Sequence, residues 1–177
     1  MVGCRIYVRE GMSGMIILGI DPGTAITGYG VIQTNRSGQV RTLGYGAIRT
    51  PANERVDLRL RNIYDQLSLL LDEFEPDALA IEQLFFNRNV TNALAVGQAR
   101  GVVILAAAQR TIAVAEYTPL QVKQAVTGQG RADKDQVGYM VRLLLGLQAV
   151  PKPDDTADAL AVGICHAFNG RGWGAVQ

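Results

Sequence analysis

The stretch ILGIDPGTAITGYGVI, residues 17–32, decides the fold of this chain, because two apolar runs flank a single carboxylate and a turn. The first run predicts a buried strand over residues 15–20, and the alternation in residues 28–34 predicts a second strand. Asp21 stands where the first strand ends, and Pro22-Gly23 then turns the chain. Two interpretations are open: Asp21 only helps to reverse the chain, or it is a ligand held on a rigid strand end.

The residues downstream extend this start into an α/β pattern. Alternation predicts a third strand over residues 40–49, and leucines and isoleucines at helical spacing predict a helix that Pro76 stops. The remaining predicted elements are strands within 77–86 and 112–118 and helices over 91–109, 119–127, 133–146 and from about 151 to 168. We therefore expect a mixed five-stranded sheet, three antiparallel strands and then two parallel ones, with helices on both faces.

Length and composition limit the class of protein. The chain has 177 residues, of which 48% are hydrophobic and 19% charged, and this fits one globular domain, expected over residues 15–170. Residues 1–14 are expected to be a disordered or non-native extension, and residues 171–177 a tail. Two distant cysteines offer neither a disulfide framework nor a zinc-binding spacing, and no apolar run approaches the roughly 20 residues of a membrane span. We expect a cytoplasmic protein without a membrane partner.

Charge is unevenly distributed along a chain whose net charge is only +1. Residues 83–142 hold seven Lys or Arg against three Asp or Glu, which gives +4, so the rest of the chain sums to −3. A basic half is compatible with a face that approaches a phosphate backbone. An imbalance of this size is also typical of ordinary solvated surface, so charge by itself does not decide between the two.

Three further carboxylates stand at positions that need an explanation. Glu82 lies within the apolar run ALAIEQLFF, where an ionised carboxylate is unfavourable unless it is paired or bound to a metal. The alternative is an edge strand that turns Glu82 to solvent. Asp155 and Asp158 share one face at the start of the last helix. Acids there, Asp154 included, also cap helices and oppose the helix dipole.

Together with Asp21, these acids come from three separate elements that the predicted sheet brings together. Converging carboxylates repel one another, so such a cluster favours divalent cations that neutralise it. Oxygen ligands without a partner Cys or His pair point to Mg²⁺ or Mn²⁺ rather than zinc. Two such ions activate water and stabilise a leaving oxygen in phosphodiester cleavage. The single histidine, His166, is expected to be structural.

Five blocks of the sequence are similar, in order and spacing, to one known family. They are ILGIDPGTAITGYGVI, AIEQLFF, VGQARGVVILAAA, YTPLQVKQAVTGQGRADKDQV and DDTADALAVGICHA, and they span Met15 to Phe168. The chain resembles the RuvC family of bacterial Holliday junction resolvases, within the ribonuclease H-like superfamily. The resemblance implies a homodimeric, magnesium-dependent endonuclease that nicks two opposed strands of four-way junction DNA in recombination and repair. It also implies a branch-migration helicase complex of the RuvA and RuvB type as a partner.

The resemblance assigns roles to residues by position. The family's metal-binding acids fall on Asp21, Glu82, Asp155 and Asp158, which implies two Mg²⁺ ions per subunit, with Mn²⁺ as a substitute. Its basic catalytic residues fall on Lys123 and Lys134, where they would meet phosphates or the developing charge. Isolated lysines are otherwise typical of solvated surface.

An aromatic residue of the family that stacks on or wedges between bases near the crossover corresponds to Phe85, with Phe86 adjacent. An aromatic pair after a strand is more often core, but the sequence FFNRN sets this pair directly against polar residues. Arg88 and Arg131 are further candidates for DNA contact.

Some alternatives stay open at this point. The helix over 91–109 is apolar or small around most of its circumference, which indicates either a dimer partner or a central core position. The hexapeptide GIDPGT also resembles the phosphate loop of actin-like ATPases, but those need two domains, and 177 residues are too few. A non-catalytic junction-binding module of the same fold is the other alternative, and acids at all four positions argue against it.

Overall fold

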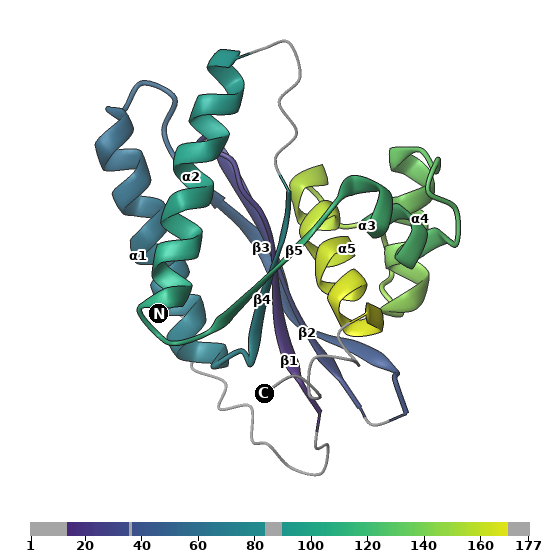
Figure 1. Ribbon diagram of the computed structural model, residues 1–177. Coiled ribbons are helices and arrows are strands. Elements are labelled where there is room, and N and C mark those ends of the chain that lie inside the picture. The colour runs from purple at the N-terminus through teal and green to yellow at the C-terminus, as the bar shows by residue number, and fades with distance from the viewer. Residues whose placement is uncertain (1–13, 36, 84–89, 170–177) are drawn as a thin grey trace.

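The structure of the protein, a computed structural model, describes residues 14–35, 37–83 and 90–169. These residues form one five-stranded sheet with helices on both of its faces (Figure 1). Along the sheet the strands follow the order β3-β2-β1-β4-β5. In chain order they are β1 (Ile16–Asp21), β2 (Ile26–Thr34), β3 (Val40–Arg49), β4 (Ala78–Glu82) and β5 (Ala113–Tyr117).

The pairing of the strands confirms the predicted mixed sheet. β2 pairs antiparallel with both β1 and β3, whereas β4 pairs parallel with β1, and β5 pairs parallel with β4. The parallel strands are each reached through a helix, because a parallel neighbour cannot be joined by a tight turn. β1 is therefore the central strand, and the end of β1 that carries Asp21 lies between β2 and β4.

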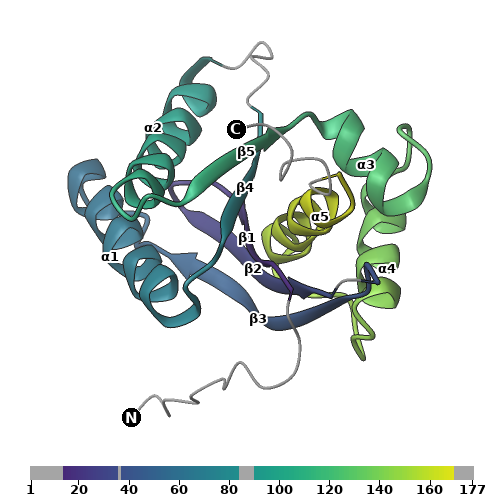
Figure 2. The same ribbon diagram turned by 60° about the horizontal axis from the view of Figure 1, so that its bottom comes forward.

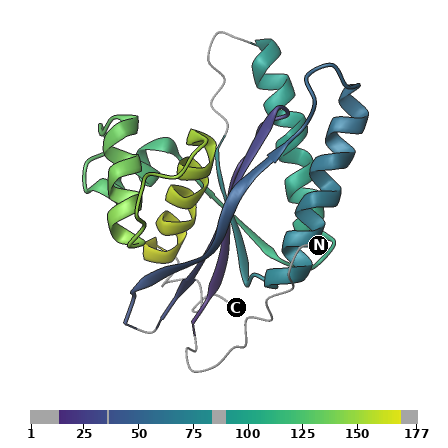
Figure 3. The ribbon, with the colours of Figure 1, turned by 180° about the vertical axis from the view of Figure 1, so that it is seen from behind.

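The helices form layers on the two faces of the sheet (Figures 1 and 3). On one face lie α1 and α2, and α5 lies directly on the other, with α3 and α4 packed outside it (Figure 2). The helices are α1 (Val56–Phe74), α2 (Val90–Ala108), α3 (Pro119–Thr127), α4 (Lys134–Leu144) and α5 (Asp154–Asn169). No helix in the described ranges is long and apolar enough to cross a bilayer.

The bounds of the domain are not decided by these residues. Residues 1–13 and 170–177 lie outside the described part of the chain, so the expected limits of 15–170 stay a prediction.

Local sequence signals explain where the helices begin and end. α3 begins at the predicted residue because Thr118 and Gln121 form a capping box, and α4 begins one residue after Asp133, which forms the same motif with Gln136. α1 ends at Phe74, with Glu75 in the left-handed conformation at φ 43°, because the residue before Pro76 is disfavoured in the helical region.

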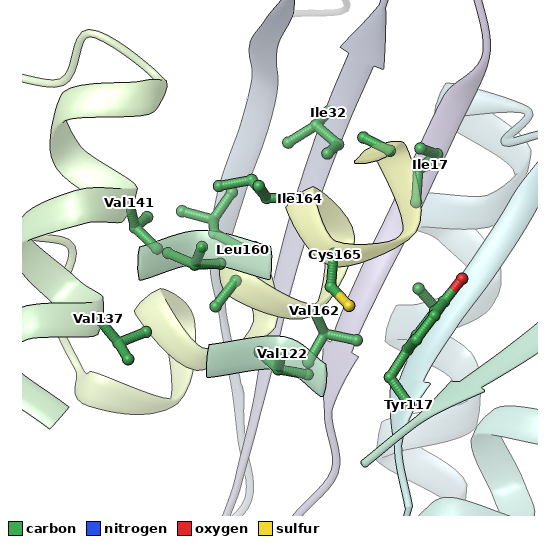
Figure 4. Packing of buried hydrophobic residues seen from close by; sticks show 14 of the residues in the cluster. Ile17, Ile32, Tyr117, Val122, Val137, Val141, Leu160, Val162, Ile164 and Cys165 are labelled. Atoms are coloured by element: carbon green, nitrogen blue, oxygen red, sulfur yellow. The ribbon is translucent and has the colours of Figure 1, made fainter. Parts of the chain in front are cut away.

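Two hydrophobic cores lie on either side of the sheet. Strand residues alternate between them, so Ile17 faces α5 while Leu18 faces α1 and α2. Figure 4 shows the core on the α5 side, where Leu160 and Ile164 of α5 pack with Ile17 and Ile32 of the sheet. α5 lies very close to the sheet because Gly19 leaves room for it: a Cβ at that position would overlap the backbone carbonyl of Ala159.

Helix α2 buries only one of its faces. Its buried side chains are Ala99, Val103, Ala106 and Ala107, which pack in the core shared with α1. The opposite face is exposed, and the side chains of Leu94 and Leu105 are 65% and 53% accessible. The alternative that α2 is a central core helix is therefore wrong for the described part of the chain, whose other elements leave this face exposed. A dimer partner on this face stays a prediction.

Candidate active site

Strand alternation brings Asp21 and Glu82 to the same face of the sheet. In β1, Ile17, Gly19 and Asp21 point toward α5, and in β4, Ala80 and Glu82 do the same. Gly19 pairs with Ala80, so Asp21 and Glu82 lie side by side two residues further along the parallel strands. β4 is an interior strand with β1 and β5 as neighbours. The edge-strand explanation of Glu82 is therefore wrong, and its carboxylate is half-buried at the end of the sheet.

A glycine in β2 brings the first turn of α5 to the same place. Gly28 is the register partner of Asp21, and a Cβ on Gly28 would overlap the backbone carbonyl of Asp155. The helix start therefore lies against β2 with no side chain between them. Asp155 in this first turn and Asp158 at the start of the next turn are both half-buried. Gly28 was not predicted from the sequence, although its place on one face of an alternating strand next to the strand of Asp21 is a signal that could have identified it.

The electrostatics of Asp21 show that the four acids interact. The pKa of Asp21 is raised to about 7, first by burial and then by the charges of Asp158, Asp155 and Glu82, in that order. Burial likewise raises the pKa of Glu82 and of Asp158 above their usual values. A carboxyl with a pKa near 7 is poorly neutralised by its surroundings, so the site favours an added positive charge.

Lys134 supplies part of that positive charge. Its Nζ lies 3.0 Å from Oδ2 of Asp158 and 3.9 Å from Oδ2 of Asp154. The hydrogen bond to Asp158 raises the pKa of Lys134, and the lysine in turn lowers the raised pKa of Asp21. Lys134 is thus an ammonium group set among carboxylates rather than an isolated surface lysine.

Asp154 and Asp155, which are neighbours in sequence, have different surroundings. Asp154 is exposed, and the Nζ of Lys152 lies 2.6 Å from its Oδ1, which lowers the pKa of Asp154. Asp155 is half-buried, and its charge contributes to the raised pKa of Asp21. The two acids are therefore distinguished by burial, with Asp155 on the side of Asp21.

An open cleft of about 230 Å³ lies beside these acids. Glu82 and Asp158 line it together with both lysines that the family resemblance singles out, Lys123 and Lys134. Lys123 also lowers the raised pKa of Glu82. The apolar walls of the cleft come from α3, α4 and α5 and are formed by Pro119, Val122, Val137 and Ala161. Residues that are far apart in sequence thus meet in one concave site.

The donor atoms at this site fit a hard divalent cation. All are carboxylate oxygens, the ligands that Mg²⁺ and Mn²⁺ prefer. Across the described ranges, no three His, Cys, Asp or Glu side chains are grouped closely enough to hold an ion as they stand. Mutual repulsion keeps like charges apart, and Asp158 is hydrogen-bonded to Lys134. The chemistry of the site therefore fits a metal, while the ligand set itself stays a prediction.

The other predicted site residues have varied outcomes. Phe85, Phe86 and Arg88 lie outside the described residues. Arg131 is exposed between α3 and α4. His166 is buried in α5, where its Nδ1 lies 2.7 Å from the hydroxyl of Tyr117, and burial lowers its pKa. This agrees with the structural role expected for the histidine.

Known proteins match this chain over nearly its whole described length. The family described as "Crossover junction endodeoxyribonuclease RuvC" matches residues 17–166. A crossover junction endodeoxyribonuclease RuvC from Moorella thermoacetica is 60% identical over 153 residues, which cover 86% of this chain and 91% of that protein. The corresponding protein from Desulforamulus reducens is 56% identical over 162 residues, covering 89% of this chain and 99% of that protein.

A solved structure gives the same result. Thermus thermophilus RuvC in complex with a Holliday junction substrate superposes with a TM-score of 0.84 at 39% identity, covering 89% of this chain and 95% of that chain. Relatives this similar share the fold. The chain therefore belongs to the RuvC family of crossover junction endodeoxyribonucleases.

Proposed function

We propose that this protein cleaves four-way DNA junctions by hydrolysing one phosphodiester bond in each of two opposed strands. The observation that carries the proposal is Asp21, a half-buried carboxyl with a pKa of about 7 that interacts with three other acids. The cleft beside it holds two lysines and is open to solvent. Such a site attracts divalent cations and a phosphate group together.

The acids Asp21, Glu82, Asp155 and Asp158 are the proposed ligands of two Mg²⁺ ions per subunit, with Mn²⁺ as a substitute. Nucleases of this family are metal-dependent. When bound, the ions supply Lewis-acid activation of the phosphate and of the attacking water. The burial of Asp155 and the pairing of exposed Asp154 with Lys152 support Asp155 as the ligand.

The protein's own residues hold and screen the reacting group. Lys123 and Lys134 line the cleft on the α3 and α4 side, where their ammonium groups stabilise the negative charge that develops on the phosphate. Lys134 contacts Oδ2 of Asp158, so Oδ1 of that carboxylate would still be available to a cation while the ammonium stays beside the phosphate position.

Further contacts with the junction are proposed from sequence. Phe85 and Phe86 are the proposed stacking or wedging residues at the crossover, and Arg88 and Arg131 contact the backbone. Residues 15–170 form the proposed nuclease domain. We also propose that the protein acts in the cytoplasm with a branch-migration complex of the RuvA and RuvB type, in recombination and repair.

A homodimer is the proposed assembly, formed through the exposed face of α2. The residues of this face recur at spacings of four and three, as in a helix that packs along its length: Leu94, Gln98, Gly101, Leu105 and Ala108. Burying these exposed leucines against a second copy of the helix is favourable, because it removes apolar surface from water. A two-fold axis here presents two active sites to two related strands, so paired nicks follow from symmetry.

The activity is tested on a labelled synthetic four-way junction incubated with the protein and Mg²⁺ or Mn²⁺. We expect paired, symmetric nicks from the native protein. Asp155→Asn should lower the cleavage rate more than about 100-fold, which corresponds to about 2.7 kcal/mol of activation free energy. Asp154→Asn is the matched control, because it changes the adjacent, exposed acid.

Equal activity of the Asp155 and Asp154 variants would overturn the ligand assignment. Junction binding without cleavage in either metal would instead support the non-catalytic module.

A further inference from the structure

The loop that follows Asp21 is anchored to β3 and α1 by a chain of hydrogen bonds. The backbone N–H of Thr50 donates to the carbonyl of Ala25 at 3.1 Å, and its hydroxyl donates to the carbonyl of Thr24. Nε of Arg59, on α1, in turn donates to that hydroxyl oxygen at 2.8 Å. Arg59 is therefore linked through one threonine to the turn that sets the position of the first proposed ligand.

Arg59 is half-buried without an acid, whereas three arginines on or beside α1 and α2 are paired, and Arg61, which also lacks an ion pair among the described residues, is exposed. Arg55 pairs with Asp57 at 2.9 Å, Arg110 with Asp72 at 2.7 Å, and Arg100 with Glu116 at 2.7 Å. Within the described residues, Arg59 has no carboxylate at ion-pair distance, although it is half-buried. An arginine offers five N–H donors in a rigid fork, and only Nε is used by Thr50. A half-buried guanidinium without an acid is suited to an anion that arrives from solution.

The position of Arg59 identifies which anion that is. It lies in the first turns of α1 and, through Thr50, beside the loop that follows Asp21. Helix α1 lies on the face of the sheet opposite to α3 and α4 (Figure 1). Lys123 and Lys134 stand on the α3 and α4 side of the acids. A DNA strand that crosses the acids at the end of the sheet therefore meets lysines on one side and Arg59 on the other.

We propose that Arg59 binds a backbone phosphate of the junction strand next to the phosphate that is cleaved, and that Thr50 connects this contact to the loop after Asp21. The guanidinium fork matches phosphate oxygens, and its Nε bond fixes the fork in place before DNA arrives. Arg59 is a binding residue, and Thr50 is a positioning residue. The inference rests on the proposed action on junction DNA.

The test measures binding of a synthetic four-way junction without added divalent cation, over a range of KCl concentrations. Arg59→Gln keeps a donor for Thr50 but removes the charge, and Arg59→Lys keeps the charge. Arg61→Gln is the matched control, because Arg61 is exposed on the same helix about 200° around it. Thermal melting of each variant verifies that the fold is intact.

We expect Arg59→Gln to reduce the slope of log K against log[KCl] by about 0.9, the loss of one phosphate contact on duplex DNA. Arg59→Lys and Arg61→Gln should keep the native slope. Thr50→Val should also keep it, while raising the Mg²⁺ concentration that gives half-maximal cleavage, because the loop after Asp21 loses its anchor.

A native slope in Arg59→Gln would overturn the phosphate contact. So would an equal loss of slope in Thr50→Val, because the effect would then come from the loop and not from the charge. The slope is a binding measurement, so it is defined even if the native protein does not cut. Failure of the proposed nuclease function would appear as binding without nicks in the native protein, which is a separate result.

Discussion

At the scale of single residues, the structure separates acids that look equivalent in sequence. Asp21 is half-buried at a strand end, where desolvation and three neighbouring acids raise its pKa to about 7. Asp154 is exposed, and its pKa is lowered by Lys152. An ionised carboxylate is thus unfavourable at Asp21 and favourable at Asp154. Asp21, where the negative charge is unfavourable, is the acid suited to binding a cation.

The raised pKa of Asp21 predicts how stability depends on pH in the absence of metal. Folding favours the protonated carboxyl, so this stabilising contribution is fully present below the unfolded value of 3.8 and is lost as pH rises through about 7. In EDTA at pH 8, Asp21→Asn should therefore melt several degrees above the native protein, since 1 kcal/mol corresponds to about 2–4 °C in a domain of this size. The difference should shrink as the pH falls toward 4.

Magnesium gives the control for this prediction. Mg²⁺ should raise the melting temperature of the native protein at pH 8 and have little effect on Asp21→Asn. A variant that melts below the native protein in EDTA at pH 8 would show that Asp21 is already well neutralised by the fold.

At the scale of elements, a strand of alternating glycines determines where α5 lies. Gly28 and Gly30 of β2, and Gly19 of β1, all face α5, and a Cβ on any of them would overlap that helix. Glycine in the interior of a strand weakens that strand, but here it allows α5 to pack directly on the sheet. This close packing places Asp155 against Gly28, the register partner of Asp21.

Gly28→Ala should therefore displace the first turn of α5 rather than unfold the sheet. We expect a stability loss of about 1–3 kcal/mol, typical of overpacking, together with a higher Mg²⁺ requirement for cleavage. Denaturant unfolding and cleavage at graded Mg²⁺ measure the two effects.

Gly44→Ala is the matched control for this variant, because its Cβ would meet only the ring of Phe74, at 3.1 Å, far from the acids in the fold. If both alanine variants require the same Mg²⁺ concentration as the native protein, close approach at Gly28 does not position the site.

At the scale of the whole molecule, the two faces of the sheet carry different surfaces. The α5 side, with α3 and α4 outside it, holds the acids and the cleft, whereas the α1 and α2 side ends in an exposed apolar helix face. The described residues therefore bring the candidate acids and lysines together on one side of the sheet and leave an exposed helix face on the other. This division allows two copies to pair without covering their cleavage sites.

The dimer prediction is tested with Leu105→Arg, which places a charge in the middle of the exposed face of α2. We expect the sedimentation coefficient to fall to that of a monomer, and paired nicks to become single, uncoupled nicks in one strand at a time. Leu143→Arg is the matched control, since Leu143 is an exposed leucine of α4 on the other side of the sheet. A native protein that sediments as a monomer at working concentrations would contradict the proposed assembly.

Sequence alone predicted the order and type of the elements, which the structure confirms, and it singled out four candidate acids. Apolar alternation, helical spacing, capping residues and prolines are local signals, so strands and helices such as α3 could be predicted nearly to the residue. Glu82 was conspicuous because a charge inside an apolar run is unfavourable in any packing. Family resemblance then connected these acids with Lys123 and Lys134.

Only the tertiary structure decided how those residues meet. It placed β4 in the interior of the sheet, exposed one face of α2, and separated Asp155 from Asp154 by burial. It also revealed Gly28 beneath α5, and Arg59 without an acid in the part of the chain that the structure describes. Burial, pKa and charge balance depend on residues that are distant in sequence and close in space. For that reason no local pattern could have supplied them.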